Sequence, residues 1–259
     1  MIALSKKDKQ GIIIIFSVIV IAIIIFMIYF YQLQSSKRFD PKTLCPTTGV
    51  VTGQVIVLID KSDKWASNDA EILKRFLLKI YKRIPATHRL TIVAITGKGR
   101  ETTTVKTLFD MCNPGNDDEC NFLYQNCRKI RKKYIESFFA PLQKITNFLV
   151  SPSESSYSPL FETIVELIDK YDSQKLNFYI ISDLMENGPK FRFYDIVPLS
   201  DEIIQEYPIS VQKKIFAHLL LIERRRHSRQ LINAVKNVWV DYFSSQGIKV
   251  NCRRLLIAD

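Results

Sequence analysis

Hydrophobic residues follow two patterns along the chain: one dense apolar block near the start, then short apolar runs that alternate with helical stripes. The block, residues 12–31, reads IIIIFSVIVIAIIIFMIYFY and carries no charge. Its length of about 20 residues suits an α-helix that crosses the hydrocarbon core of a bilayer. Because no small-residue cleavage site follows, the block predicts an uncleaved transmembrane anchor rather than a secretory signal.

The patterns after the block predict an α/β domain. Continuous apolar runs indicate strands buried on both faces, and apolar residues that recur every three or four positions indicate amphipathic helices. The predicted strands are 53–60, 89–95, 103–109, 176–182, 214–222 and 248–257, and the predicted helices are 68–84, 121–149, 159–171, a short one near Ile203, and 229–245. This alternation predicts a Rossmann-like, doubly wound, mostly parallel six-stranded sheet with one antiparallel edge strand from the hairpin 89–109.

The chain therefore divides into three predicted parts. Residues 1–36 form the tail and anchor, residues 37–52 form a linker without periodicity, and residues 53–259 form the α/β domain. A domain of this size can bury a large hydrophobic core without disulfide bonds.

The charges that flank the apolar block do not determine on which side of the membrane the domain lies. Three lysines precede the apolar block and three basic residues follow it, so the positive-inside rule is nearly balanced. A short basic N-terminus usually stays inside, which favours a single-pass protein of the bacterial inner membrane with a periplasmic domain. The net charge of +11 suits either anionic partners or ordinary solvated faces. Beside a membrane the second interpretation is favoured, and nucleic acid is not expected as a partner.

The five cysteines do not have the spacing of a zinc site. Cys112, Cys120 and Cys127 lie close together in the sequence. If the domain is exported, a disulfide such as Cys112–Cys120 can form, whereas in the cytoplasm all five are expected to be thiols. Ordinary buried or half-buried cysteines are the favoured interpretation.

Acidic residues end two of the predicted strands, Asp60 and Asp183. In parallel sheets, ligands bind beyond the carboxyl ends of the strands. Ser62 follows Asp60 by two positions, and Ser158 opens the predicted helix 159–171. Carboxylate and hydroxyl oxygens are the ligands that Mg²⁺ prefers, so the sequence predicts a divalent-cation site made by Asp60, Ser62, Ser158 and Asp183.

This set of loops resembles the metal-ion-dependent adhesion site (MIDAS) of von Willebrand factor A (vWA) domains. Asp60-Lys-Ser62-Asp-Lys64 resembles the family's D-x-S-x-S loop, Ser158 stands at the position of its Thr, and Asp183 follows the strand that carries its second Asp. The resemblance covers residues 53–259 and implies a vWA-like fold. In the family, the metal's open position takes a carboxylate from a partner protein. Lys64 replaces the second Ser and cannot coordinate a cation, so the site is degenerate and Mg²⁺ binding stays open.

Three functions are compatible with these features. The favoured one is a membrane-tethered, non-enzymatic module that binds an unidentified protein partner, with a cation at the partial MIDAS. An alternative is a Mg²⁺-dependent nuclease that uses Asp60, Asp63 and Asp183. The other is a metal-free scaffold in which Lys64 takes the place of the cation. No nucleophile triad or phosphate-binding loop stands out, and His218, within an apolar strand, is expected to be a core histidine.

Overall fold

The computed structural model describes residues 6–34, 40, 42–47, 51–62, 67–97, 103–115, 120, 126–149, 157–171, 174–210, 213–224 and 227–255. The chain separates into two compact units, Met1–Arg38 and Phe39–Asp259. Asp63 and Lys64, which the sequence analysis places in the first loop of the site, lie outside the described residues.

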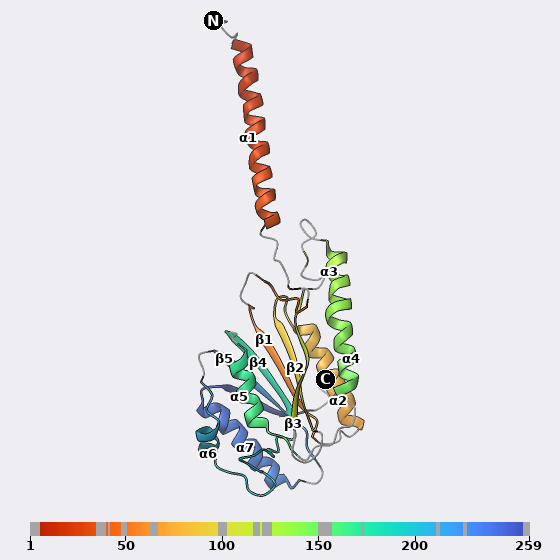
Figure 1. Cartoon of the computed structure of the whole chain (residues 1–259), viewed down its shortest axis with the longest axis vertical. Coiled ribbons are helices and arrows are strands. Elements are labelled where there is room, and N and C mark those ends of the chain that lie inside the picture. Colours follow the sequence, from red (N-terminus) through yellow and green to blue (C-terminus); the bar gives the residue numbers. More distant parts are fainter. Residues whose placement is uncertain are drawn as a thin grey trace. The chain divides into compact units, whose positions relative to one another are not determined.

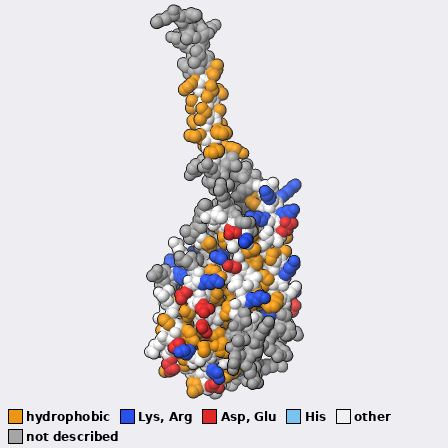
Figure 2. Space-filling view, in the orientation of Figure 1, with side chains coloured by type: hydrophobic (Ala, Val, Ile, Leu, Met, Phe, Trp, Pro, Cys, Tyr) orange, Lys and Arg blue, Asp and Glu red, His pale blue; other side chains and the backbone are white. Residues whose placement is uncertain are grey.

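The first unit is a single helix, α1, from Lys6 to Gln34. The large apolar side chains described between Ile15 and Phe30 are exposed, and Figure 2 shows them as a column of hydrophobic atoms around the helix. Over the residues that the structure describes, no helix combines the length and the apolarity needed to span a membrane.

The second unit is an α/β domain around a six-stranded sheet, which confirms the predicted fold class. Its strands are β1 (Gln54–Asp60), β2 (Arg89–Gly97), β3 (Thr103–Cys112), β4 (Lys175–Ser182), β5 (Lys214–Leu221) and β6 (Lys249–Arg254). Its α-helices are α2 (Ser67–Arg83), α3 (Cys127–Lys133), α4 (Ala140–Leu149), α5 (Leu160–Lys170), α6 (Ser200–Glu206) and α7 (Arg229–Ser245).

The strand order is β3-β2-β1-β4-β5-β6, and every neighbouring pair is parallel except β2 and β3. The predicted antiparallel hairpin at one edge is therefore confirmed. The order reverses direction between β1 and β4, and such a switch point opens a crevice at the carboxyl ends of the two central strands.

Helices cover both faces of the sheet, as Figure 1 shows, with α2, α3 and α4 on one side and α5, α6 and α7 on the other. Alternate residues of the buried strands feed two separate cores. In β1, Ile56 and Leu58 pack with α5 and α7, whereas Val57 and Ile59 pack with α2 and α4. This alternation explains why β1 reads as one continuous apolar run.

The long helix predicted at 121–149 differs from the structure in its start and its continuity. Helix α3 begins at Cys127 because the Asn126 side chain accepts a hydrogen bond from the Lys129 N–H and caps it. A π-helical segment, Tyr134–Phe139, then separates α3 from α4. Figure 2 shows Lys and Arg side chains gathered over the α3 end of this helical stretch.

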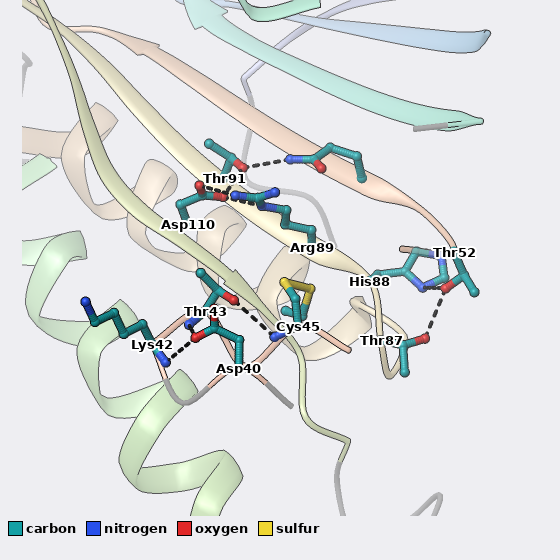
Figure 3. Close-up of a disulfide and its surroundings, with 12 residues drawn as sticks. Asp40, Lys42, Thr43, Cys45, Thr52, Thr87, His88, Arg89, Thr91 and Asp110 are labelled. Carbon is teal, nitrogen blue, oxygen red and sulfur yellow. Dashed lines mark hydrogen bonds and ion pairs between the residues drawn. A yellow bond between two sulfur atoms is a disulfide. The ribbon is translucent and has the colours of Figure 1, made fainter. Parts of the chain in front are cut away.

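Two disulfides join four of the five cysteines. Cys45 bonds to Cys112, and Cys120 bonds to Cys127, so Cys112 and Cys120 are both in disulfides but not with each other. Cys112 ends β3, where the Thr43 carbonyl accepts its N–H at 2.8 Å and holds Cys45 beside it (Figure 3). Residues 42–47, part of the predicted linker, are thereby bound to the sheet, and Leu44 is buried.

Candidate functional site

The sheet places Asp60 beside Ser182, the residue before Asp183, at its switch point. Strands β1 and β4 are parallel, with Ile59 opposite Ile181, so the next residues, Asp60 and Ser182, lie beside each other at the carboxyl ends. The even-numbered residues of both strands, such as Leu58 and Ile180, face α5 and α7. The side chains of Asp60 and Ser182 therefore meet on the side of the sheet where Ser158 precedes α5.

Asp60 is the centre of the site. Its Oδ2 accepts hydrogen bonds from the hydroxyls of Ser158, at 2.9 Å, and Ser182, at 2.8 Å. Its Oδ1 accepts the backbone N–H of Ser62 at 2.9 Å. The residue is only 4% exposed, and this burial, followed by the nearby charge of Asp183, raises the pKa of the Asp60 carboxyl.

Asp183 belongs to the same cluster but has a separate set of partners. Its Oδ1 accepts the Met185 N–H at 3.1 Å. Its Oδ2 lies 3.8 Å from Arg224 Nε and 3.8 Å from His227 Nε2, both in the segment between β5 and α7. All three side chains are almost fully buried, and at 3.8 Å these contacts are longer than hydrogen bonds, so among the described residues Asp183 Oδ2 is a buried acceptor without a hydrogen-bond partner.

The structure thus brings all four predicted residues together, in unequal roles. Ser62 and Ser158 form hydrogen bonds to Asp60. Asp183 acts on Asp60 through its charge, which raises the pKa of the Asp60 carboxyl. The sequence analysis missed Ser182. The alternation of strand residues could have found it. Ser182 lies two positions after Ile180 in β4 and Asp60 lies two positions after Leu58 in β1, so both side chains are on the same face of the sheet.

Glu186 is a second residue that the sequence analysis missed. It is 1% exposed, and its Oε2 accepts the Phe161 N–H at 3.0 Å, in the first turn of α5. Pro159 at the N-cap offers no side-chain cap, so Glu186 satisfies this helix end from another loop. Burial raises the pKa of Glu186 well above its ordinary value. Gly188 leaves the necessary space, because a Cβ there would collide with Glu186 Oε1.

Lys61, the residue between Asp60 and Ser62, points away from the site. Its Nζ donates to the Phe148 carbonyl at 2.8 Å and lies 4.0 Å from the centroid of the Phe148 ring. A lysine at the last turn of α4 opposes the negative end of that helix. Lys61 therefore couples the end of β1 to α4, although burial lowers the pKa of its ammonium group.

Internal contacts of the described residues compete with a divalent cation for the oxygens of this site. A MIDAS-type cation needs carboxylates whose charge is free to compensate it and a coordination position open to a partner. Here Asp60 is buried and accepts three hydrogen bonds, whereas Asp183 faces Arg224 and His227 but its buried Oδ2 accepts no hydrogen bond from the described residues. Over the described part of the chain, no three His, Cys, Asp or Glu side chains are grouped to hold a metal.

His218 departs from its predicted place in the core. It is half-buried rather than enclosed, and its ring stacks on Tyr179 with centroids 4.5 Å apart. Burial, followed by the charge of Arg253, lowers the pKa of the imidazole. His218 therefore lies on a face of the sheet that is only partly covered.

Comparison with known proteins adds no name to this geometry. No protein-family model matches the sequence, and no curated protein is significantly similar to it.

Proposed function

We propose that the chain is a membrane-anchored, extracytoplasmic protein-interaction module built on a vWA-like domain. The observation that carries this proposal is the switch-point site. Asp60 ends β1 in a sheet of order β3-β2-β1-β4-β5-β6 and accepts hydrogen bonds from Ser158 and Ser182. An acidic strand end, a D-x-S loop and a hydroxyl ahead of the next helix occupy the ligand-binding edge of vWA domains in this order.

The uncharged apolar block of residues 12–31 supports the anchor. The large side chains described from Ile15 to Phe30 within it are exposed. An apolar surface of this kind is unfavourable in water and favourable against lipid acyl chains. Residues 12–31 supply the bilayer contact, as the apolar block predicts.

The two disulfides support export of the domain. Cys45–Cys112 and Cys120–Cys127 are stable in oxidising compartments, and the bacterial cytosol keeps such thiols reduced. With Lys6, Lys7 and Lys9 on the cytoplasmic side, the module occupies the periplasmic face of a bacterial inner membrane.

The loop after β4 supplies the contact surface that a protein-interaction module requires. Tyr194, Ile196 and Leu199 are 48%, 76% and 71% exposed and follow Asp183 in the chain, and the centroid of the Tyr194 ring lies 5.8 Å from that of the His227 ring. Exposed apolar side chains grouped beside a polar site are typical of protein-binding surfaces. Asp60 accepts three hydrogen bonds within the protein and Asp183 faces Arg224, and partner binding in this proposal does not require a divalent cation.

The nuclease alternative has less support from the geometry. Metal-dependent phosphodiester cleavage needs several carboxylates that converge on a site open to substrate. Asp60 and Asp183 are 4% and 8% exposed, and Arg224 and His227 stand against Asp183.

Site-specific photo-cross-linking in intact bacterial membranes tests the interaction function. A photoreactive amino acid at position 196 or 199 is expected to give a discrete cross-linked band with and without a metal chelator. Ile135, 45% exposed on the π-helical segment, provides a matched control position that is expected to give none. Equal cross-linking at all three positions, or none at any, would contradict the proposal.

Cysteine accessibility tests the topology in the same membranes. Without reductant, a bulky maleimide is expected to modify the denatured chain only at Cys252, the cysteine that forms no disulfide. Modification of all five cysteines in protein that was trapped with acid before lysis would place the domain in a reducing compartment.

A further inference from the structure

The sheet face on the α2 side is incompletely covered over β4, β5 and β6. In β4 the residues that face α5 and α7 are buried, whereas Asn177 and Tyr179 on the opposite face are only half-buried. Strand β5 repeats the pattern, with Phe216 38% exposed and His218 half-buried. Strands of a parallel sheet are normally covered on both faces, so this half-face differs from the rest of the sheet.

A cavity of about 350 Å³ lies where this half-face meets α2. Its volume falls in the lower part of the range of about 300–1,000 Å³ that is typical of ligand sites. Apolar and aromatic residues of the cavity wall are Val55, Phe76, Ile80, Ile84, Pro85 and Tyr179. We call this cavity, with the adjoining face of β4 to β6, the α2–β6 groove.

Positive charge converges on the described walls of the groove. Lys79 and Arg83 line it from α2 and Arg253 lines it from β6, while none of the described residues that line it carries a carboxylate. Within the described part of the chain, none of these three cations forms an ion pair. The Arg253 guanidinium lies 5.9 Å from the centroid of the Phe76 ring, so charge and aromatic surface are adjacent. Like charges gathered in one place without counter-charges repel one another, and an anionic partner would remove this cost.

We propose that the α2–β6 groove docks an acidic segment of a partner protein. Carboxylates of that segment pair with Arg83, Arg253 and Lys79, and its apolar side chains pack on Phe76 and Tyr179. This inference rests on the proposed interaction function and adds to it a second surface, whose occupant has a defined chemistry. An acidic amphipathic segment fits because it supplies both negative charge and the apolar cover that this half of the sheet lacks.

The aromatic geometry favours a protein segment over single-stranded nucleic acid. Proteins that bind single strands offer free aromatic faces on which bases stack. One face of Tyr179 is covered by His218, with an interplanar angle of 13°, and Phe76 meets Tyr179 edge-on at 67°. The groove therefore offers apolar edges with surrounding cations rather than a stacking platform.

Fluorescence anisotropy with the full-length protein in neutral detergent tests this assignment. The probe is a short fluorescent peptide of Glu and Leu in an amphipathic helical pattern. The comparison probes are the same peptide with Lys in place of Glu, and a single-stranded oligothymidylate of similar length. The wild-type protein is expected to bind the Glu peptide in a saturable way, weakening with salt, and to bind the Lys peptide at least about tenfold more weakly.

Charge-reversed variants locate the binding. The double variant Arg83→Glu/Arg253→Glu is expected to lower the affinity for the Glu peptide at least about tenfold. The control, Arg75→Glu/Lys82→Glu, makes the same change in net charge on exposed α2 residues outside the cavity lining and is expected to change the affinity less than about twofold. Both variants are accepted only if their thermal unfolding matches the wild type.

Three results would overturn the docking proposal. These are equal losses in the two double variants, tighter binding of the oligothymidylate than of the Glu peptide, and no saturable binding of the Glu peptide. None of these results affects the expected cross-linking at Ile196 and Leu199. The docking proposal can therefore be refuted while the proposed interaction function stands.

Discussion

Removal of each disulfide in turn tests whether the segment around Cys45 is part of the folded domain. The Cys45–Cys112 bond joins residues 67 positions apart, whereas Cys120–Cys127 joins residues 7 positions apart. A cross-link restricts the unfolded chain more when it closes a longer loop. The chain-entropy relation gives ~4.4 kcal/mol for the longer loop and ~2.4 kcal/mol for the shorter one at 25 °C.

The perturbation is a pair of double variants, Cys45→Ala/Cys112→Ala and Cys120→Ala/Cys127→Ala. Urea unfolding of the full-length protein in neutral detergent gives the free energy of unfolding for each. Trp239 is fully buried and reports loss of the core when Trp65 is replaced by Phe in every sample. The first variant is expected to lose about 4 kcal/mol and the second about 2 kcal/mol.

The test compares the losses in the free energy of unfolding of the two double variants with each other. Residual structure in the unfolded chain affects both variants, so it largely cancels in this comparison. If removal of Cys45–Cys112 costs no more than removal of Cys120–Cys127, residues 42–47 do not constrain the sheet and the reasoning is refuted. Reduction of the wild-type protein should lower its stability to that of a chain lacking both bonds.

Three further perturbations address the switch-point site and its supports. Ser158→Ala removes one donor from the buried Asp60 carboxylate and should destabilise the domain by about 1–3 kcal/mol in urea unfolding, whereas an unchanged midpoint would mean that this hydrogen bond does not form. Glu186 has a raised folded pKa, so its contribution to stability is fully present below its ordinary value of 4.5 and is lost as the pH rises through the raised value. Glu186→Gln keeps an acceptor for the Phe161 N–H and should therefore flatten this decline and stabilise the protein at neutral pH, and a pH profile parallel to that of the wild type would contradict the assignment. Lys61→Met leaves the Phe148 carbonyl without the Lys61 donor and should cost about 1–3 kcal/mol, which thermal or urea unfolding can measure against the exposed control Lys144→Met.

The fold was largely predictable because its signals are local. The apolar run at 54–60 and the hairpin after Arg89 gave the strands and the antiparallel edge, since burial on both faces and a short turn leave clear periodicities. Asp60 and Ser158 could be paired from the order of strand and helix alone. In a parallel sheet, this order brings their loops to one edge.

The missed features depend on contacts between distant segments. Cys112 pairs with Cys45 because the chain folds back against the end of β3, which sequence spacing does not encode. Glu186 caps α5 from a loop 25 residues away, because Pro159 at the N-cap has no side-chain acceptor. Arg224 approaches Asp183 from the segment after β5, and this ion pair is likewise not encoded in sequence spacing.

Calorimetric titration of Mg²⁺ and Mn²⁺ into the full-length protein tests the central claim most directly. That claim is that Asp60 accepts hydrogen bonds from hydroxyls and a backbone N–H, and that Asp183 faces basic side chains of the same chain, so that neither binds a cation. The titration is predicted to show no saturable heat, and none that differs between the wild type and Asp60→Ala. Saturable binding of one cation per chain that disappears in Asp60→Ala would contradict this account and restore a metal-dependent adhesion site.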